Sequence, residues 1–270
     1  MGRKKIILLA GLVALGCVGG CGAEVAEPAS TGFDVAEPDA DVLHELQEPE
    51  VGEVDVESGD ESNGGDAVVD EDVAPAFAPS WDDSTPLGGD RPALTFLPDD
   101  YETTKQWPVV IMLHGYSANA ALQNVYFGLE SHTTSHGYIG IAPDGLRDSL
   151  GNRFWNATDA CCDGTGNGVD DVAYLTALID EAEERLAVDP ERIYFVGHSN
   201  GGFMSYRMAC ELGSRIAALA SVAGATFYDA DDCRAPGHTG VLQVHGTLDA
   251  VILYLGGWNY GSRYPGAEAT

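Results

Sequence analysis

The stretch IYFVGHSNGG at residues 193–202 decides the fold. Four large apolar residues are followed by glycines at 197, 201 and 202, which bracket Ser199. This pattern is typical of a buried strand that turns sharply into a helix, because only small residues let the two backbones approach so closely. We predict that Ser199 is a nucleophile and that the N–H of Asn200 faces the negative charge that develops when it attacks. The alternative is a glycine-rich helix start without chemistry.

Further strands are expected on both sides of this stretch. A first strand is predicted at 92–98, and apolar runs that end in HG, PDG and HG lie at 108–113, 138–142 and 240–244. Continuous apolar runs suit strands that are covered on both faces. Helical patterns lie between them, one starting at Asp170 or Asp171 and running to 186, the other at 200–212. The alternation predicts an α/β fold, with a mostly parallel sheet, helices on both faces and chemistry at the carboxyl ends of the strands.

Two segments at strand ends offer partners for Ser199. HGYS at 114–117 follows one strand, where α/β-hydrolases have their second oxyanion donor, so the N–H of Tyr116 is expected there and His114 is expected to be structural. HGTLD at 245–249 follows another, and Asp249 comes after the serine, as the acid does in that fold. Its role would be to orient an imidazole, and the alternative is an aspartate that closes a turn.

Together these motifs resemble the secreted polyhydroxybutyrate depolymerase and feruloyl or acetylxylan esterase group. The motifs are HGYS at 114–117, PDG at 143–145, VDDV at 169–172, GHSNGG at 197–202 and HGTLD at 245–249. The resemblance runs from about Pro92 to the end of the sequence. It implies an α/β-hydrolase fold and hydrolysis of polymer esters through an acyl-enzyme on Ser199. These esters are polyhydroxybutyrate-type polyester or the feruloyl and acetyl esters of plant polysaccharide. No cofactor is implied.

The catalytic histidine of that group has no counterpart here. It follows the aspartate by some tens of residues, whereas only 21 residues follow Asp249 and none is histidine. We expect this histidine beyond residue 270 and a domain that lacks its last elements. His238 and His245 could serve instead only by reversing the chain order of the group. A non-catalytic surface protein of the same fold and a serine peptidase stay open as alternatives.

Residues 1–21 have the features of a lipoprotein-type export signal. RKK at 3–5 precedes an apolar run at 6–15 that is too short to span a bilayer. Small residues precede Cys17 and Cys21, as in the lipobox of bacterial lipoproteins, so one of the two is expected to carry a lipid. An ordinary secretory signal is the alternative. Both predict export, to a membrane anchor or the extracellular space, where disulfides are permitted.

Acidic residues are concentrated in front of the expected domain. The chain has 43 Asp and Glu against 13 Lys and Arg, a net charge of -30. Between residues 22 and 90 there are 21 acidic residues and no Lys or Arg. Such a self-repelling, proline-punctuated segment predicts a disordered tether at 22–84, with the folded domain at 85–270. The charge argues against a nucleic-acid partner and against docking on anionic lipid.

Four cysteines lie beyond the signal, at Cys161, Cys162, Cys210 and Cys233. An even number in an exported domain predicts two disulfides, with three possible pairings. We expect that Cys161 and Cys162 do not bridge each other and that each pins the loop after Asp144 to Cys210 or Cys233. Their spacing is not that of a zinc site, so no metal is predicted. In the same loop, Trp155 and Asn156 are candidates for the substrate mouth, with a buried Trp155 as the alternative.

Overall fold

The computed structural model describes residues 81–82, 84–234 and 237–270. The predicted export signal, both candidate lipid sites and most of the predicted tether therefore lie outside the described residues. Trp81 already packs against the main core of the domain. Across the described ranges, the helices are all too short or too polar to span a bilayer.

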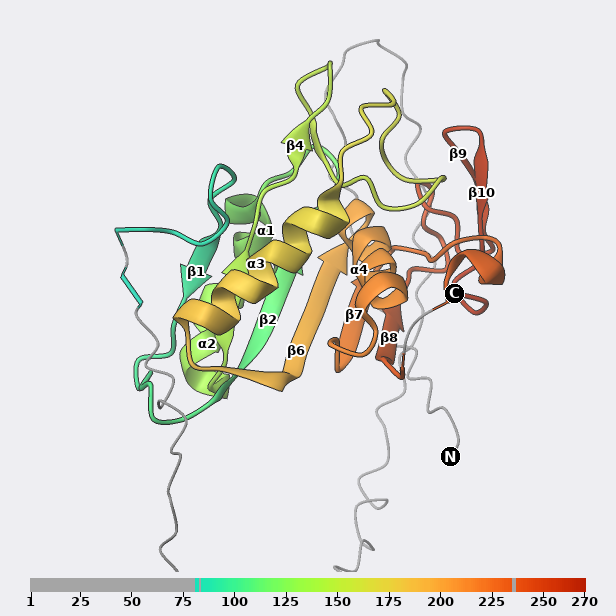
Figure 1. Cartoon of the computed structure of the whole chain (residues 1–270). Coiled ribbons are helices and arrows are strands. Elements are labelled where there is room, and N and C mark those ends of the chain that lie inside the picture. The colour runs from blue at the N-terminus through green and yellow to red at the C-terminus, as the bar shows by residue number, and fades with distance from the viewer. Residues whose placement is uncertain (1–80, 83, 235–236) are drawn as a thin grey trace, which may run out of the picture. The chain divides into compact units, whose positions relative to one another are not determined.

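A six-stranded sheet forms the centre of this part of the chain (Figure 1). The strand order is β1-β3-β2-β6-β7-β8, with β1 antiparallel to β3 and every other pair parallel. The strands are β1 (Leu94–Phe96), β2 (Trp107–Leu113), β3 (Ile139–Ala142), β6 (Val188–His198), β7 (Ala218–Val222) and β8 (Gly240–Val244). The predicted mostly parallel sheet is confirmed, with β7 as a strand that the sequence did not reveal.

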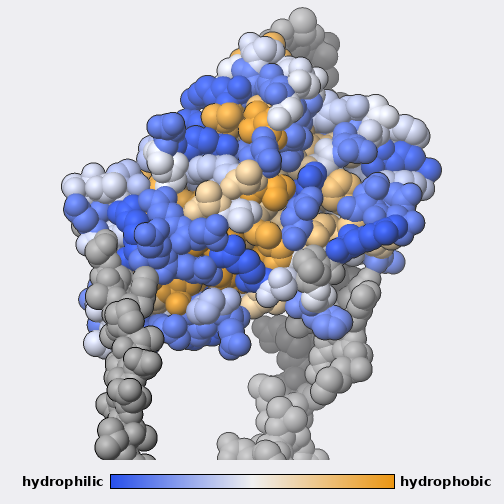
Figure 2. Space-filling view, viewed as in Figure 1, coloured by the Kyte–Doolittle hydropathy of each residue, from blue (hydrophilic) through white to orange (hydrophobic). Residues whose placement is uncertain are grey.

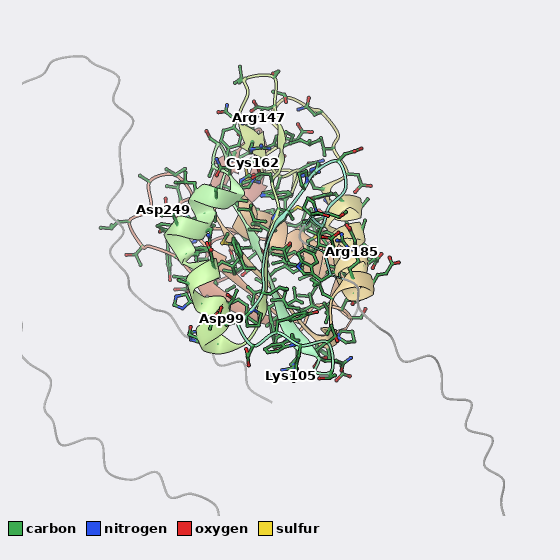
Figure 3. The ribbon with its side chains drawn as sticks, turned by 90° about the vertical axis from the view of Figure 1, so that its left-hand side faces the viewer. Asp99, Lys105, Arg147, Cys162, Arg185 and Asp249 are labelled. Carbon is green, nitrogen blue, oxygen red and sulfur yellow. A yellow bond between two sulfur atoms is a disulfide. The ribbon has the colours of Figure 1, made fainter. Side chains whose placement is uncertain are left out.

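Helices cover both faces of the sheet. They are α1 (Ala120–Phe127), α2 (Leu129–His136), α3 (Asp171–Arg185) and α4 (Asn200–Leu212). Figure 3 shows α1 and α2 on one side of the sheet and α3 on the other. The predicted start of α3 is resolved in favour of Asp170, whose side chain accepts a hydrogen bond of 2.9 Å from the N–H of Ala173. The observed α4 has the bounds that its pattern predicts.

The apolar run of β2 supplies both cores. Ile111 and Leu113 belong to the larger buried cluster, and Met112 between them belongs to a smaller one with Leu129 of α2. Successive side chains of a strand point to opposite faces, so a strand between two helical layers needs an unbroken apolar run. On the face seen in Figure 2, polar side chains dominate the surface and apolar residues show between them.

The parallel strands end together at one edge of the sheet. Leu113 of β2 pairs with Gly197 of β6, and His198 pairs with Val222 of β7, which in turn pairs with Val244 of β8. Residues that directly follow these strands therefore share that edge, which is where α/β folds carry their sites. Two hairpins are formed by β4 (Leu146–Arg147) with β5 (Arg153–Phe154) and by β9 (Gly257–Asn259) with β10 (Ser262–Tyr264).

Candidate active site

Ser199 occupies the sharp turn between β6 and α4. Its φ of 50° and ψ of -117° lie in a region that L-residues rarely adopt. A Cβ on Gly197 would lie 2.1 Å from the carbonyl oxygen of Gly201, and a Cβ on Gly201 would lie 2.1 Å from that of Leu113. The glycines therefore permit the turn, and the Ser199 N–H anchors it by donating to Val222 O at 2.8 Å. The serine itself is half-buried.

The loop after β2 lies directly against this turn. A Cβ on Gly115 would lie only 3.6 Å from the Cβ of Ser199. The next residue, Tyr116, has its hydroxyl hydrogen-bonded to Asp148 at 2.5 Å, and this bond raises the pKa of Tyr116 to about 12. The Ser117 N–H donates to Arg153 O at 2.8 Å, which fixes the loop to β5.

Two backbone N–H groups are available beside Ser199. No group among residues 81–82, 84–234 and 237–270 accepts a hydrogen bond from the N–H of Tyr116. Asn200 is the first residue of α4, so its N–H has no acceptor within the helix. The positive end of the α4 helix dipole adds positive potential near both N–H groups. The two predicted donors thus belong to different segments, the loop after β2 and the start of α4, that meet at the Ser199 turn.

The Asn200 side chain holds the loop beneath the turn. It is fully buried, accepts a 2.7 Å hydrogen bond from the N–H of Trp155, and donates to Trp155 O at 2.8 Å and to Cys161 Sγ at 3.4 Å. Trp155 is also fully buried, and its indole N–H donates to His114 O. Trp155 therefore takes the buried position that was the alternative for this residue, because the loop turns its side chain into the core and away from solvent.

His114 is a buried neutral histidine in this arrangement. Its Nε2 accepts the N–H of Gly145 at 2.9 Å, so its Nδ1 carries the hydrogen and donates to Gly115 O at 2.8 Å. Burial lowers the pKa of His114. Both ring nitrogens are occupied in holding two loops together, which supports the structural role predicted for this residue.

Asp249 lies at the same edge and closes its own loop. Its Oδ1 accepts the N–H groups of Val251 at 2.9 Å and Ile252 at 3.1 Å, and Oδ2 lies 3.6 Å from His245 Nε2. Burial lowers the pKa of His198, the residue before Ser199, and the charge of Asp249 raises it. The Asp249 carboxylate thus plays the turn-closing part that the sequence left open, and its charge acts on His198 next to Ser199.

His238 and His245, the two histidines considered as replacements for the base, are not hydrogen-bonded to Ser199. His245 is 7% exposed; its Nδ1 accepts from Gln243 Nε2 at 3.2 Å, so its Nε2 donates to Ile252 O at 2.6 Å. His238 precedes β8 and so lies at the opposite edge of the sheet. Within the described ranges, no imidazole is hydrogen-bonded to Ser199 Oγ. These ranges also contain no group of three or more His, Cys, Asp or Glu that could hold a metal ion.

The disulfide pairing differs from the prediction. Cys161 and Cys162 are bonded to each other across a cis peptide bond, and Cys210 is bonded to Cys233 with Cα atoms 4.8 Å apart. The reason lies in α4: Cys161 touches Asn200 at its start, whereas Cys210 is ten residues further on. At 1.5 Å per residue, Asn200 and Cys210 are about 15 Å apart along α4. This is too far for a bridge between Cys161 and Cys210.

Comparison with known proteins adds sequence relatives. A family model described as chlorophyllase matches residues 82–226, more than half of the chain. "Probable feruloyl esterase C" of Aspergillus niger is 30% identical over 178 residues, 63% of this chain and 59% of that protein. "Feruloyl esterase B" of Piromyces equi is 29% identical over 170 residues, 62% of this chain and 31% of that protein. The chain thus spans less than two thirds of the length of these relatives. A solved structure, "Acetyl xylan esterase from Aspergillus awamori", has a TM-score of 0.48 at 15% identity and covers 60% of this chain and 69% of its own.

Proposed function

We propose that this chain, which belongs to the chlorophyllase family and has the α/β-hydrolase fold, is a serine carboxylic-ester hydrolase acting on esters of plant polysaccharide. The observation that carries the proposal is the strained Ser199 turn beside the unused N–H of Tyr116. The sequence relatives named feruloyl esterases support a feruloyl ester as substrate, and one named a bifunctional acetylxylan esterase/xylanase supports an acetyl ester. Polyester of the polyhydroxybutyrate type stays a prediction from the resemblance.

In the proposed reaction, Ser199 Oγ attacks the ester carbonyl carbon as its proton passes to a base. The oxyanion accepts hydrogen bonds from the N–H groups of Asn200 and Tyr116. The bond to the alcohol then breaks, the alcohol leaves with the proton, and an acyl group stays on Ser199. Water hydrolyses this acyl-enzyme by the same route in reverse. Asp249 would orient the imidazole that serves as base.

The proposed reaction needs a nucleophile, two N–H donors, an acid and a base. The described residues supply candidates for all of these except the base. By the resemblance it is a histidine that follows Asp249. In its absence the Ser199 hydroxyl stays protonated, and turnover would be limited to what the oxyanion hole and binding provide, about 10³–10⁴-fold over water in other serine hydrolases. A non-catalytic surface protein with the hydrolase fold stays the alternative prediction, and the experiment below separates the two.

The decisive experiment compares the full chain with Ser199→Ala on p-nitrophenyl acetate, with and without added imidazole. We expect turnover that depends on Ser199 and that imidazole increases in the unchanged chain beyond its increase in Ser199→Ala, because free imidazole can act as a base for the Ser199 hydroxyl. Ser135→Ala removes an exposed hydroxyl on α2 and is the matched control. Equal rates for the unchanged chain and Ser199→Ala at every imidazole concentration would favour the non-catalytic protein. Turnover of p-nitroacetanilide at a comparable rate would favour the peptidase.

The cellular context belongs to the same proposal. The signal-like residues 1–21 support export, with a lipid on Cys17 or Cys21 and the acidic residues 22–84 as a spacer from the membrane. An enzyme held in this way would meet polymeric substrates outside the cytoplasm. Metabolic labelling with a fatty-acid analogue, compared between Cys17→Ser and Cys21→Ser, tests the anchor and assigns it to one cysteine.

A further inference from the structure

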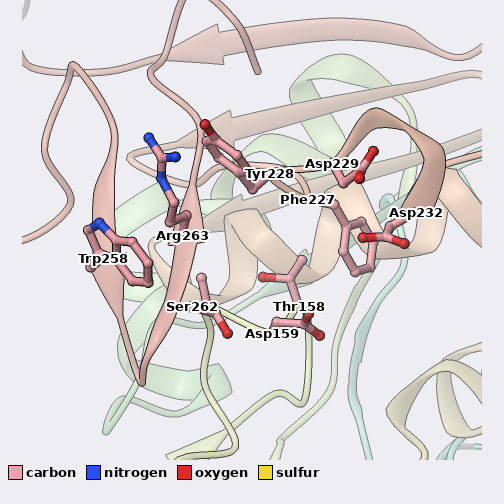
Figure 4. A pocket seen from close by; sticks show the side chains of 10 residues that line it. Thr158, Asp159, Phe227, Tyr228, Asp229, Asp232, Trp258, Ser262 and Arg263 are labelled. Atoms are coloured by element: carbon pink, nitrogen blue, oxygen red, sulfur yellow. The ribbon is translucent and has the colours of Figure 1, made fainter.

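A cavity of about 270 Å³ lies at the carboxyl edge of the sheet, apart from the residues of the Ser199 turn (Figure 4). Three segments form it: residues 158–160, the segment 227–232 that follows β7, and the β9–β10 hairpin. The size is just below the roughly 300–1,000 Å³ of sites for drug-sized ligands, so it suits one small ring. Trp258 of the hairpin is 68% exposed and Tyr228 is 51% exposed, which makes these two rings accessible at the surface.

The cavity combines aromatic rings with separated polar groups. The Arg263 guanidinium lies 4.1 Å from the ring centroid of Tyr228 and 5.7 Å from that of Trp258. Asp159 and Asp232 line the same cavity, yet within the described ranges Arg263 forms no ion pair with any carboxylate. Figure 4 shows Arg263 on the side of Trp258 and Tyr228, and Asp232 on the side of Phe227. Hydrogen-bond donors and acceptors therefore face the cavity from different walls.

We infer that this cavity binds one sugar ring of a neutral saccharide, the alcohol part of the ester, and this inference rests on the proposed function. The carboxylates of Asp159, Asp229 and Asp232 against the one guanidinium of Arg263 disfavour an anionic ligand. A sugar ring presents apolar C–H faces to aromatic side chains, while its hydroxyl groups donate to carboxylates and accept from arginine.

Several contacts join the cavity to the nucleophile. Ala160 precedes Cys161, whose Sγ accepts a hydrogen bond from the Asn200 side chain. From α4, the helix that Ser199 opens, Arg207 donates to Ala157 O at 3.1 Å and lies over the Phe227 ring. The Ser199 turn and two walls of the cavity are thus held by one helix, so a saccharide seated in the cavity is kept in a defined relation to the nucleophile.

The test uses two esters with one acyl group and different alcohols, acetylated xylotetraose and p-nitrophenyl acetate. In Trp258→Ala and Arg263→Ala, the ratio of kcat/KM for the saccharide ester to kcat/KM for p-nitrophenyl acetate should fall about tenfold, through KM, because only the sugar contacts are removed. Leu255→Ala and Arg234→Ala remove exposed side chains from neighbouring segments outside the cavity and should keep the ratio. An unchanged ratio in both cavity variants would overturn the inference.

A binding measurement separates this inference from the proposed function. Unacetylated xylotetraose is titrated calorimetrically into Ser199→Ala, which needs no turnover, and into Ser199→Ala with Trp258→Ala or Arg263→Ala. Binding to the first protein and at least tenfold weaker binding to a folded double variant are expected. Absence of binding to Ser199→Ala overturns the sugar site even if the ester is cleaved. Binding without any Ser199-dependent turnover overturns the proposed hydrolase and leaves the sugar site standing.

Discussion

The backbone conformation of Ser199 depends on the residues around it. Gly197 and Gly201 allow the backbone to bend at the serine. Their spacing around Ser199 is a local pattern, so the sequence reveals this turn. The neighbouring histidines behave differently: His114 and His245 are each locked by two hydrogen bonds, and only the folded structure shows this.

The neutral state of His114 predicts a dependence of stability on pH. Burial lowers its pKa most; the hydrogen bond to Gly115 O and the charge of Asp144 raise it, and the charges of Arg153 and Arg91 lower it. The unfolded ring binds a proton near pH 6.5, whereas the folded ring does so only at lower pH. The contribution of neutral His114 to the free energy of unfolding should therefore be fully present above pH 6.5. It should decrease as the pH falls from 6.5 through the pKa of the folded protein, by up to about 1.4 kcal/mol per pH unit.

Urea unfolding at pH 7.5 and 5.5 measures this dependence. His114→Gln should reduce the loss of stability between the two pH values, because the proton-binding group is removed. His132→Gln, on the exposed face of α2, is the matched control and should keep the original loss. An identical loss in both variants would assign the effect to another group.

At the scale of elements, the start of α3 is joined to two segments that precede it in the chain, around Arg91 and Asn156. The sequence predicted a cap at Asp170 or Asp171, and the structure divides two roles between them. Asp170 caps the helix, whereas the fully buried Asp171 carboxylate pairs with Arg91 at 2.8 Å and accepts the N–H of Asn156. Arg91 also stacks on the Tyr174 ring at 3.8 Å. A buried charge needs a partner, and Arg91 reaches it from a segment 80 residues away.

Replacing Arg91 by alanine should therefore be costly. The variant leaves the Asp171 carboxylate buried without its counter-ion, for which a loss of about 3–5 kcal/mol in the free energy of unfolding is typical. Arg192→Ala breaks an exposed pair with Asp189, in which the arginine side chain is 45% exposed, and should cost about 0–1 kcal/mol. Urea unfolding of both variants gives the comparison. A loss for Arg91→Ala no larger than for Arg192→Ala would mean that water or another group replaces the ion pair.

At the scale of the whole domain, the two disulfides differ in what they constrain. Cys210–Cys233 ties the end of α4 to the segment between β7 and β8 and closes a loop with a sequence separation of 23, whereas Cys161–Cys162 links neighbours. A cross-link stabilises mainly by reducing the freedom of the unfolded chain, and more so for a longer loop. The first bridge should therefore matter for overall stability and the second for the loop that contacts Asn200.

Removal of each bridge tests this difference. The double variant Cys210→Ser/Cys233→Ser should lose about 3 kcal/mol in the free energy of unfolding. The matched variant Cys161→Ser/Cys162→Ser should lose clearly less, since neighbouring residues are close in the unfolded chain as well. Equal losses measured by urea unfolding would contradict the chain-entropy explanation.

Much of the fold could be predicted because its signals are local. The runs at 108–113 and 240–244 became β2 and β8 with bounds that differ by at most one residue, and α4 began and ended where its pattern predicts. In contrast, β7 (ALASV) was missed because small residues make a weak apolar run, and α1 and α2 were missed because they bury few residues. These elements take their positions from the sheet that they pack against.

The amino-acid sequence alone determined the α/β architecture and the serine at a glycine-lined turn, since strand length, helical period and backbone sterics act between residues close in the chain. Only the tertiary structure decided which cysteines pair, that Trp155 is buried, that His245 is occupied and that an aromatic cavity with Arg263 shares the edge of the sheet. Each of these depends on the distance between segments that are far apart in sequence. That distance is fixed by how helices and strands pack, which no local pattern encodes.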